Sequence, residues 1–297
     1  MRTLIVKYIK SDFEKVVCSW FEKNGCKVIG FDQLAKGKTG VKKRLSYINS
    51  ARNGFNCDCE QIIVFDDYDF FIIYKMFGKK KICLWMWNKI SNSRIELLKL
   101  KIAKLFGDVY SFDKGDSQKY GLKYNTQFYS LKYVDQSPKR DIYQKLFFIG
   151  KDKNRYRLIR KMAEYLDENK INYSFMVFPD KGGCYDRTDL ISKVYMDYDD
   201  VCSMIRSSEA VLDIVQEGQE GLTLRAMEAV FFDKKIVTNN LKYLEYSFYS
   251  PDKVYIIHEE NFDGLNEFLN NKIEVKYSNE CKEYFDISSW IERFKIS

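Results

Sequence analysis

The stretch GQEGLTLRAMEAVFFDKKIVTNN, from Gly218 to Asn240, decides how this chain is predicted to fold. It begins as a glycine-bearing polar turn, continues as a helix and ends in the apolar strand KKIVTNN. Gly221, Arg225 and Glu228 follow at intervals of four and three, so a helix would stack them on one face. A phosphate at the helix start would meet backbone N–H groups and the positive end of the helix dipole. A carboxylate two turns in could accept hydrogen bonds from ribose hydroxyls, so the segment predicts a site for a phosphorylated, hydroxylated ligand.

The composition is that of a globular protein with room for two domains. The chain has 297 residues, of which 45% are hydrophobic and 31% charged, which suits two packed cores. Aromatic residues reach 16%, and we attribute most of them to a low-GC genome rather than to stacking on sugars or bases. The only histidine is His258, so a histidine base is nearly excluded and acid–base chemistry falls to Asp or Glu.

The excess of positive charge is mild but partly concentrated. The net charge is +7, and one run around Gly37 and Gly40 holds five cations: Lys36, Lys38, Lys42, Lys43 and Arg44. Such a run is usually a solvated face, but it would also suit an anionic lipid surface or a phosphate-bearing acceptor. No nucleic-acid recognition motif accompanies it, so we expect no nucleic-acid partner.

Cysteine usage and hydropathy indicate a cytoplasmic protein. Eight cysteines occur, and the start MRTLIVKYIKSDFEK becomes polar too soon for a secretory signal, so reduced thiols are expected. No run approaches the roughly 20 apolar residues of a membrane span. Any membrane contact would therefore be peripheral, at the inner face.

Short apolar runs alternate with helical patterns in two successive series, which predicts an α/β fold with parallel sheets. The first series runs from RTLIVKYI to DVYSFD, and the second from KLFFIG to KVYIIH. The polar stretch from Val134 to Asp141 is the predicted linker. It divides the chain into an acceptor-side domain, 1–137, and a nucleotide-binding domain, 138–284, while a helix at 285–297 could pack back on the first domain.

A second motif, FFIGKDKNR, lies at the start of the second series. A strand runs into Gly150, and the following loop carries Lys151, Lys153 and Arg155. Glycine permits close backbone approach and the cations would neutralise a diphosphate. The motif is neither G-x-G-x-x-G nor a Walker loop, so an ordinary turn with solvated lysines stays the alternative. For the Gly218 segment the alternative is a plain βαβ unit in which Arg225 and Glu228 merely pair.

The segment EGLTLRAMEAVFFDKKIVTNN resembles the carboxyl-domain motif of GT-B-fold glycosyltransferases, especially bacterial surface-polysaccharide and CgeB-like members. The segments Asp108 to Tyr129 and Tyr198 to Gly221 resemble, in the same order, the end of that family's first domain and the approach to its donor site. The resemblance covers most of Lys81 to Ile257. It implies two Rossmann-like domains facing a cleft, with a nucleotide-sugar donor on the second domain and an acceptor on the first.

The resemblance also implies roles for residues. Glu228 matches the glutamate that the family uses on the donor's ribose, Gly221 to Thr223 match the phosphate-facing helix start, and Gly150 matches the glycine loop. Together with the two motifs it gives this set of donor-binding candidates: Gly150, Lys151, Arg155, Gln219, Glu220, Gly221, Leu222, Thr223, Arg225 and Glu228. Glu220 and Glu228 have the spacing of the E-x7-E form, but the glycine register differs, so no retaining mechanism is carried over.

The candidates for a catalytic base are acidic residues that follow strands of the first series. Asp66 and Asp67 follow QIIVF and Asp113 follows DVYSF, and each could deprotonate an acceptor hydroxyl or simply end its strand. Asp67-Tyr68-Asp69 and Asp197-Tyr198-Asp199 are formally D-x-D, but the first lies in the acceptor half and the second before a helix that Asp197 would cap. We therefore expect no metal and no cofactor, with a metal-dependent GT-A enzyme as an alternative.

Together these patterns predict a metal-independent glycosyltransferase. It would move a hexosyl or related group from a nucleotide-sugar donor to a growing bacterial surface glycan, such as lipopolysaccharide or capsule. The expected partners are the donor, a glycan or lipid-linked acceptor and, as an open point, an anionic membrane surface. The alternatives are a nucleotide- or nucleic-acid-binding α/β protein without transfer activity, and a degenerate transferase kept as an assembly partner.

Overall fold

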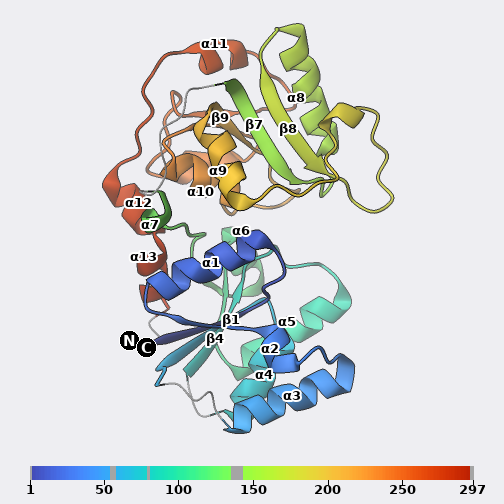
Figure 1. The fold of residues 1–297 in the computed structure, drawn as a ribbon, viewed down its shortest axis with the longest axis vertical. Coiled ribbons are helices and arrows are strands. Elements are labelled where there is room, and N and C mark those ends of the chain that lie inside the picture. Colours follow the sequence, from blue (N-terminus) through green and yellow to red (C-terminus); the bar gives the residue numbers. More distant parts are fainter. Residues whose placement is uncertain (1, 54–57, 79–80, 135–142, 295–297) are drawn as a thin grey trace. The chain divides into compact units, whose positions relative to one another are not determined.

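The computed structural model describes residues 2–53, 58–78, 81–134 and 143–294 (Figure 1). The chain forms two units, one of Met1–Gln127 with Ile287–Ser297 and the other of Phe128–Asp286. Each unit contains one parallel sheet, which confirms the predicted α/β class. The predicted linker lies, apart from Val134, outside the described residues.

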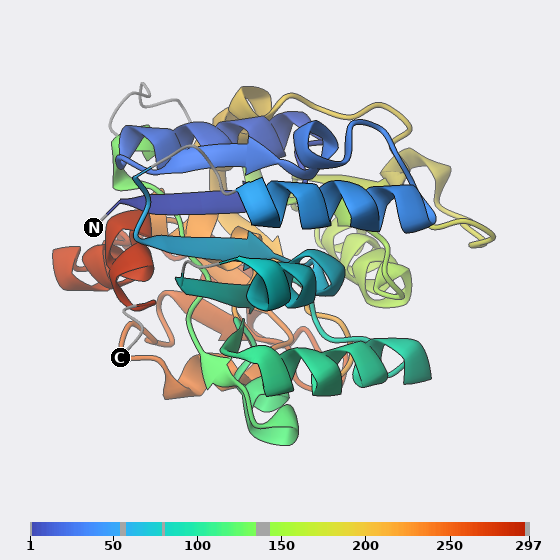
Figure 2. The same ribbon diagram turned by 90° about the horizontal axis from the view of Figure 1, so that it is seen from below.

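The first unit is built on a six-stranded sheet in the order β2-β1-β3-β4-β5-β6, with neighbouring strands running the same way (Figure 2). The strands are β1 (Thr3–Lys7), β2 (Lys27–Gly30), β3 (Gln61–Phe65), β4 (Lys81–Met86), β5 (Val109–Ser111) and β6 (Lys123–Tyr124). Every residue of β1 and β3 is buried, as expected for central strands of a sheet that is covered on both faces.

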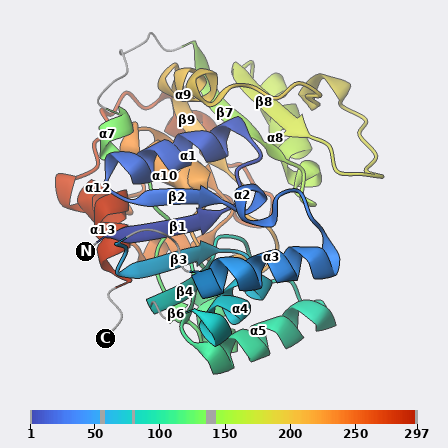
Figure 3. The ribbon, with the colours of Figure 1, turned by 60° about the horizontal axis from the view of Figure 1, so that its bottom comes forward.

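Helices cover the two faces of this sheet differently. The helices of the first unit are α1 (Asp12–Lys23), α2 (Phe31–Ala35), α3 (Gly40–Asn53), α4 (Tyr68–Phe77), α5 (Arg94–Phe106), α6 (Lys114–Tyr120) and α13 (Ile287–Glu292). Helices α3, α4 and α5 lie together along one face (Figure 3) and share a core with it. On the other face Trp290 of α13 is fully buried, with its ring centroid 4.8 Å from that of Trp85 and 5.7 Å from that of Phe21 of α1.

The second unit is built on a five-stranded sheet in the order β11-β10-β9-β7-β8. The strands are β7 (Gln144–Lys151), β8 (Tyr173–Phe178), β9 (Ser208–Asp213), β10 (Lys235–Thr238) and β11 (Val254–Ile256). The helices are α7 (Leu131–Val134), α8 (Tyr156–Glu168), η1 (Thr188–Leu190), α9 (Tyr198–Arg206), α10 (Leu224–Phe231), η2 (Leu241–Glu245), α11 (Leu265–Asn270) and α12 (Asn279–Phe285). Helices α8 and α11 share one core with the sheet, while α9 and α10 contact β9.

Two local predictions need correction. The cation run was expected around a glycine loop, but α3 begins at Gly40, so Lys42, Lys43 and Arg44 lie in its first turns. Asp113, a candidate for the catalytic base, begins a helix after DVYSF because it is the N-cap of α6. Neither helix carries a long apolar stripe, so the sequence pattern does not reveal it.

The strand orders define where ligands bind in sheets of this kind. In each sheet the chain adds its second strand on one side of the first strand and its third strand on the other side. The order reverses between β1 and β3 in the first unit and between β7 and β9 in the second. Ligand sites in open α/β sheets lie beyond the carboxyl ends of the strands at such reversals.

Candidate functional site

The loop after β7 is joined to the end of β9 at the reversal point of the second sheet. Gly150 and Lys151 end β7, and the loop Gln219–Leu222 lies between β9 and α10. The guanidinium of Arg155 joins the carboxyl ends of the two strands, because its Nη1 donates to the backbone oxygen of Ile214 over 2.6 Å. The loop of the FFIGKDKNR motif is thus joined to the end of β9, and the Gly218 segment is joined to the same end because Thr223 donates to Asp213 over 2.6 Å.

Arg155 is mainly engaged with backbone. Besides Ile214, its Nε donates to the carbonyl oxygen of Asp152 over 3.0 Å and its Nη2 donates to that of Lys151. Gly150 makes room for it, since a Cβ there would lie 3.2 Å from Nη2 of Arg155 and 3.3 Å from a ring atom of Phe148. Arg155 therefore braces the loop, whereas the exposed side chain of Lys151 is available to a ligand.

Helix α10 begins later in the chain than the sequence analysis predicted. Thr223 is its N-cap, and its Oγ1 accepts from the backbone N–H of Ala226 over 3.3 Å. The helix begins at Leu224, so Gly221 lies before it and does not share a helical stripe with Arg225 and Glu228. The residue in the preceding turn that needs a positive φ, 69°, is Gly218.

The loop before α10 is held by its own polar groups. The side-chain amide of Gln219 donates to the carbonyl oxygen of Gly221, and Asn240 donates to that of Glu220, each over 3.2 Å. Leu222 is 2% exposed and belongs to the core. Gln219, Glu220 and Leu222 therefore shape the loop, and the groups best placed for an anion are the first-turn N–H groups of α10.

Glu228 is fully buried and already paired. Its Oε2 lies 2.5 Å from Nη1 of Arg225, and its Oε1 accepts from the hydroxyl of Tyr198 over 2.8 Å. Burial raises the pKa of Glu228 to about 7, although Arg225 and the Tyr198 hydroxyl act in the opposite direction. A ribose hydroxyl could reach this carboxylate only if Tyr198 or Arg225 moved, so the predicted ribose contact stays a prediction.

A buried carboxylate that the sequence analysis missed completes this site. Asp213, the last residue of β9, accepts from the hydroxyls of Thr223 over 2.6 Å and Tyr243 over 2.8 Å. Burial raises its pKa, and the charges of Arg155 and Arg225 oppose that rise. The signal was present, because EAVLDIV places an aspartate at the end of an apolar strand.

Two of the predicted catalytic carboxylates lie at the reversal point of the first sheet. Asp67 is the N-cap of α4 and accepts from the backbone N–H of Phe70 and the hydroxyl of Tyr8, each over 2.8 Å. It also forms an ion pair with Lys43, whose Nζ lies 3.1 Å from Oδ2. Tyr8 follows β1 and Asp67 follows β3, so their bond spans the reversal. These partners engage both oxygens of the Asp67 carboxylate.

Asp66 is better suited to accept a proton. Its backbone has φ 53°, a left-handed conformation that is costly for a non-glycine residue. Its carboxylate accepts from the backbone N–H of Trp87 over 2.7 Å and the side-chain amide of Asn88 over 2.9 Å. Burial raises its pKa to about 6, close to the range in which a general base works at neutral pH.

The remaining acidic candidates have structural partners. Asp113 accepts from the backbone N–H of Asp116 over 2.8 Å as the cap of α6. Asp69 pairs with Arg44, and Asp199 accepts from the hydroxyl of Tyr133. Asp197 holds the expected N-cap position of α9, but its side chain makes no capping hydrogen bond. Within the described ranges, no three or more His, Cys, Asp and Glu side chains gather as a metal site would require.

The whole chain is similar to solved structures of a glycosyltransferase, a UDP-GlcNAc 2-epimerase and a protein in complex with UDP and glucose. The Anabaena protein Alr3699/HepE, in complex with UDP and glucose, matches with a TM-score of 0.59 and 10% identity over 99% of this chain and 98% of that one. AviGT4, a glycosyltransferase of avilamycin A biosynthesis, matches with 0.57 and 10% over 99% and 96%. The UDP-GlcNAc 2-epimerase of Neisseria meningitidis, bound to UDP-GlcNAc, matches with 0.55 and 9% over 99% and 98%.

The chain has the GT-B fold. Two parallel α/β sheets and a match along nearly the full length of these chains carry that statement. No protein-family model matches the sequence, and no curated protein matches it either. Glycosyltransferases and 2-epimerases share the fold, so the fold does not choose between these reactions. No helix among the described residues is long and apolar enough to cross a membrane.

The raised pKa of Glu228 predicts a pH-dependent contribution to stability. Between its ordinary pKa of 4.5 and about 7, the unfolded chain releases a proton that the folded chain keeps. The free energy of unfolding should fall across this window, by up to about 1.4 kcal/mol per pH unit, and level off above it. Urea unfolding of the wild type and Glu228→Gln from pH 4 to 8 measures the difference.

Glu274→Gln is the matched control, because Glu274 is an exposed glutamate of the same unit. Its difference from the wild type should show no such slope. A wild-type advantage over Glu228→Gln that rises with pH would contradict the burial-raised pKa.

Proposed function

We propose that this chain is a metal-independent glycosyltransferase that moves a sugar from a nucleoside-diphosphate sugar to a growing bacterial surface glycan. One observation carries the proposal: at the reversal point of the second sheet, Arg155 of the loop after β7 donates to Ile214 at the end of β9, and Thr223 at the start of α10 donates to Asp213 beside it. That is where α/β sheets bind phosphorylated ligands. The likeness to structures holding UDP or UDP-GlcNAc supports a nucleotide-sugar donor.

The proposed donor site assigns each group a task. Lys151 and the first-turn N–H groups of α10 bind the diphosphate, and Arg225 lies one residue into that helix. The charge that develops on the leaving diphosphate is then stabilised by fixed donors and a cation. Arg155 and Gly150 act by holding the loop after β7 in place.

The proposed acceptor chemistry uses the first unit. Asp66 takes the proton of the attacking acceptor hydroxyl, because its pKa of about 6 leaves it ionised at neutral pH. The hydrogen bonds from Trp87 and Asn88 hold its carboxylate in place. The acceptor is a glycan, free or lipid-linked.

Nucleotide binding tests the donor site directly. Calorimetric titration with UDP, GDP and CMP should show one tight ligand, and Lys151→Ala should weaken it roughly tenfold because a charged hydrogen bond to phosphate is lost. Lys272→Ala, another exposed lysine of the same unit, should leave affinity unchanged. Binding of an oligonucleotide alone, with Lys151→Ala silent, would favour the non-catalytic alternative.

The same titration can distinguish a contact of Glu228 with the ribose from a purely structural role of Glu228. If Glu228 contacts the ribose, removal of the 2′- or 3′-hydroxyl from the nucleotide should cost affinity in the wild type and nothing in Glu228→Gln. An equal cost in both proteins would assign Glu228 to holding Arg225 and Tyr198 instead.

Replacement of Asp66 tests the proposed base. Asp66→Asn should lower kcat/KM by about 10²–10⁴-fold while nucleotide affinity stays unchanged. The wild-type kcat/KM should rise with pH through about 6 and then level off, since only the ionised carboxylate accepts a proton. Asp58→Asn, at an exposed aspartate of the same unit, is the control.

Product analysis with a UDP-sugar decides between the enzymes that share this fold. Transfer to a glycan acceptor, or release of free sugar from the donor when no acceptor is present, agrees with the proposal. Conversion of UDP-GlcNAc into its C2 epimer without transfer would overturn it, as would an Asp66→Asn variant with the wild-type pH profile.

A peripheral membrane contact of the first unit belongs to the same proposal. Val41 and Leu45 on α3 are 72% and 54% exposed and lie four residues apart, beside the exposed Lys42. Apolar side chains beside cations are typical of helices that lie on anionic lipid. In contrast, Lys43 and Arg44 of the same run pair with Asp67 and Asp69.

Vesicle sedimentation checks this contact. The wild type should sediment with vesicles that contain phosphatidylserine and much less with phosphatidylcholine alone, because both charge and apolar contact are needed. Lys42→Glu with Leu45→Ser should lose the binding. Lys101→Glu with Leu105→Ser, the same changes at exposed positions of α5, should retain it, and equal sedimentation of the two double variants would contradict the assignment.

A further inference from the structure

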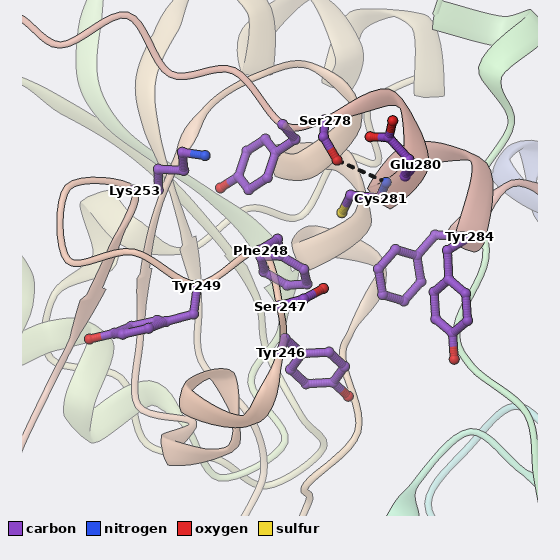
Figure 4. Close-up of a pocket in the computed structure, with 11 residues that line it drawn as sticks. Tyr246, Ser247, Phe248, Tyr249, Lys253, Ser278, Glu280, Cys281 and Tyr284 are labelled. Atoms are coloured by element: carbon purple, nitrogen blue, oxygen red, sulfur yellow. Dashed lines mark hydrogen bonds between the residues drawn. The ribbon is translucent and has the colours of Figure 1, made fainter.

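A cavity of about 430 Å³ lies in the second unit, separate from every donor-site candidate (Figure 4). Two segments line it, Tyr246–Tyr249 with Lys253 on one side and Tyr277–Phe285 on the other. Lys253 directly precedes β11, and the hydroxyl of Tyr277 donates to the carbonyl oxygen of Lys234, which precedes β10. The cavity therefore borders the amino ends of these strands, whereas the donor loops follow the carboxyl ends of β7 and β9.

The floor of the cavity is aromatic. Phe248, Tyr277 and Phe285 are 7%, 1% and 2% exposed, and the ring centroid of Phe248 lies 5.7 Å from that of Tyr277 and 6.1 Å from that of Phe285. Tyr246 stacks on Phe248 with centroids 5.4 Å apart and an angle of 24°. Figure 4 shows Phe248 amid the group, with Tyr249 and Tyr284 on opposite sides of it. These buried rings close the base of the cavity, while the partly exposed Tyr246 and Tyr249 and the exposed Tyr284 supply aromatic surface that a ligand can reach.

The other lining groups are polar and of both signs. Ser247 and Glu280 are exposed, Ser278 caps α12 through its bond from the backbone N–H of Cys281, and Lys253 donates to the carbonyl oxygen of Lys276 over 3.0 Å. The Lys253 ammonium also lies 5.3 Å from the ring centroid of Tyr277. A ligand that suits this lining has an apolar face, groups that both donate and accept, and no net charge.

Saccharides have that combination. One face of a pyranose ring carries C–H groups that lie flat on aromatic rings, and its hydroxyls donate as well as accept. An entirely apolar ligand would displace water from the exposed Ser247 and Glu280 without replacing its hydrogen bonds, which costs affinity. An anion would meet the Glu280 carboxylate and a cation would meet the Lys253 ammonium. The cavity volume lies within the range of small-ligand sites, about 300–1,000 Å³.

We propose that this cavity is a second saccharide site, which holds a neutral sugar unit away from the donor loops. The inference rests on the lining of the cavity and not on the transfer reaction. A site of this kind lets the protein keep hold of a glycan that extends beyond the sugar being transferred.

Cys281 provides a reporter, since its thiol lines the cavity and is partly exposed. Burial raises its pKa to about 11, so alkylation with iodoacetamide is slow and is best followed under alkaline conditions by mass spectrometry. The exposed Cys184, and Cys57 outside the described residues, are first replaced by Ser. The probes are the methyl β-glycosides of glucose, galactose and N-acetylglucosamine.

At least one glycoside should slow alkylation of Cys281 several-fold, while UDP should not. Tyr249→Ala and Tyr284→Ala, both at the partly exposed wall, should remove the protection. Tyr143→Ala, at an exposed tyrosine of the same unit outside the cavity, should retain it. Saturation-transfer NMR of the same glycosides with the same variants should give the same ranking and does not depend on the thiol.

Three results would overturn the proposal. Protection by indole but by no glycoside would make the cavity an apolar site, and protection by UDP would join it to the donor loops. Absence of protection and of saturation transfer with all three glycosides would leave no saccharide site. A failure to bind any nucleotide would instead reject the proposed function and would leave this site standing, because the assay uses neither donor nor transfer.

Discussion

The site in the second unit depends on one guanidinium. Arg155 donates to the carbonyl oxygens of Lys151 and Asp152 in its own loop and to that of Ile214 at the end of β9. Carbonyls at strand ends otherwise need water or a side chain, so this residue satisfies several of them at once. A side chain at Gly150 would crowd it, since a Cβ there would lie 3.2 Å from Nη2 of Arg155. The sequence analysis interpreted Gly150 as leaving space for a diphosphate. In the structure this space is taken first by the guanidinium of Arg155.

The charges of the side chains around Arg155 nearly cancel one another in the protein alone. Two buried carboxylates, Asp213 and Glu228, face two arginines, Arg155 and Arg225, and burial raises the pKa of both acids. With Glu228 partly protonated near neutral pH, Arg225 is less fully neutralised than the 2.5 Å ion pair suggests. An anion near the start of α10 would favour the protonated acid further, so anion binding and proton uptake at Glu228 are linked.

The sequence predicted most strands and the longer amphipathic helices, because their apolar periodicity is strong and local. It missed α3, where only Tyr47 and Ala51 are buried, since a stripe that short cannot be told from a polar loop. The sequence predicted both loops, but it did not predict the side-chain contacts within them. The Thr223 cap could have been predicted from residue type, whereas the bond from Arg155 to Ile214 depends on β7 and β9 being neighbours, which no local pattern shows.

The two sheets use the same strand order, and each holds a carboxylate at its reversal point by a tyrosine hydroxyl over 2.8 Å, Tyr8 on Asp67 and Tyr243 on Asp213. What surrounds those carboxylates differs. In the first unit Lys43 neutralises Asp67, and the strained backbone of Asp66 beside it turns a second carboxylate with a pKa of about 6 toward other partners. In the second unit a capped helix start and the exposed Lys151 lie at the same place. One topology thus places a carboxylate with a raised pKa in the first unit and a helix start beside an exposed lysine in the second. Under the proposed function the first would accept a proton and the second would bind an anion.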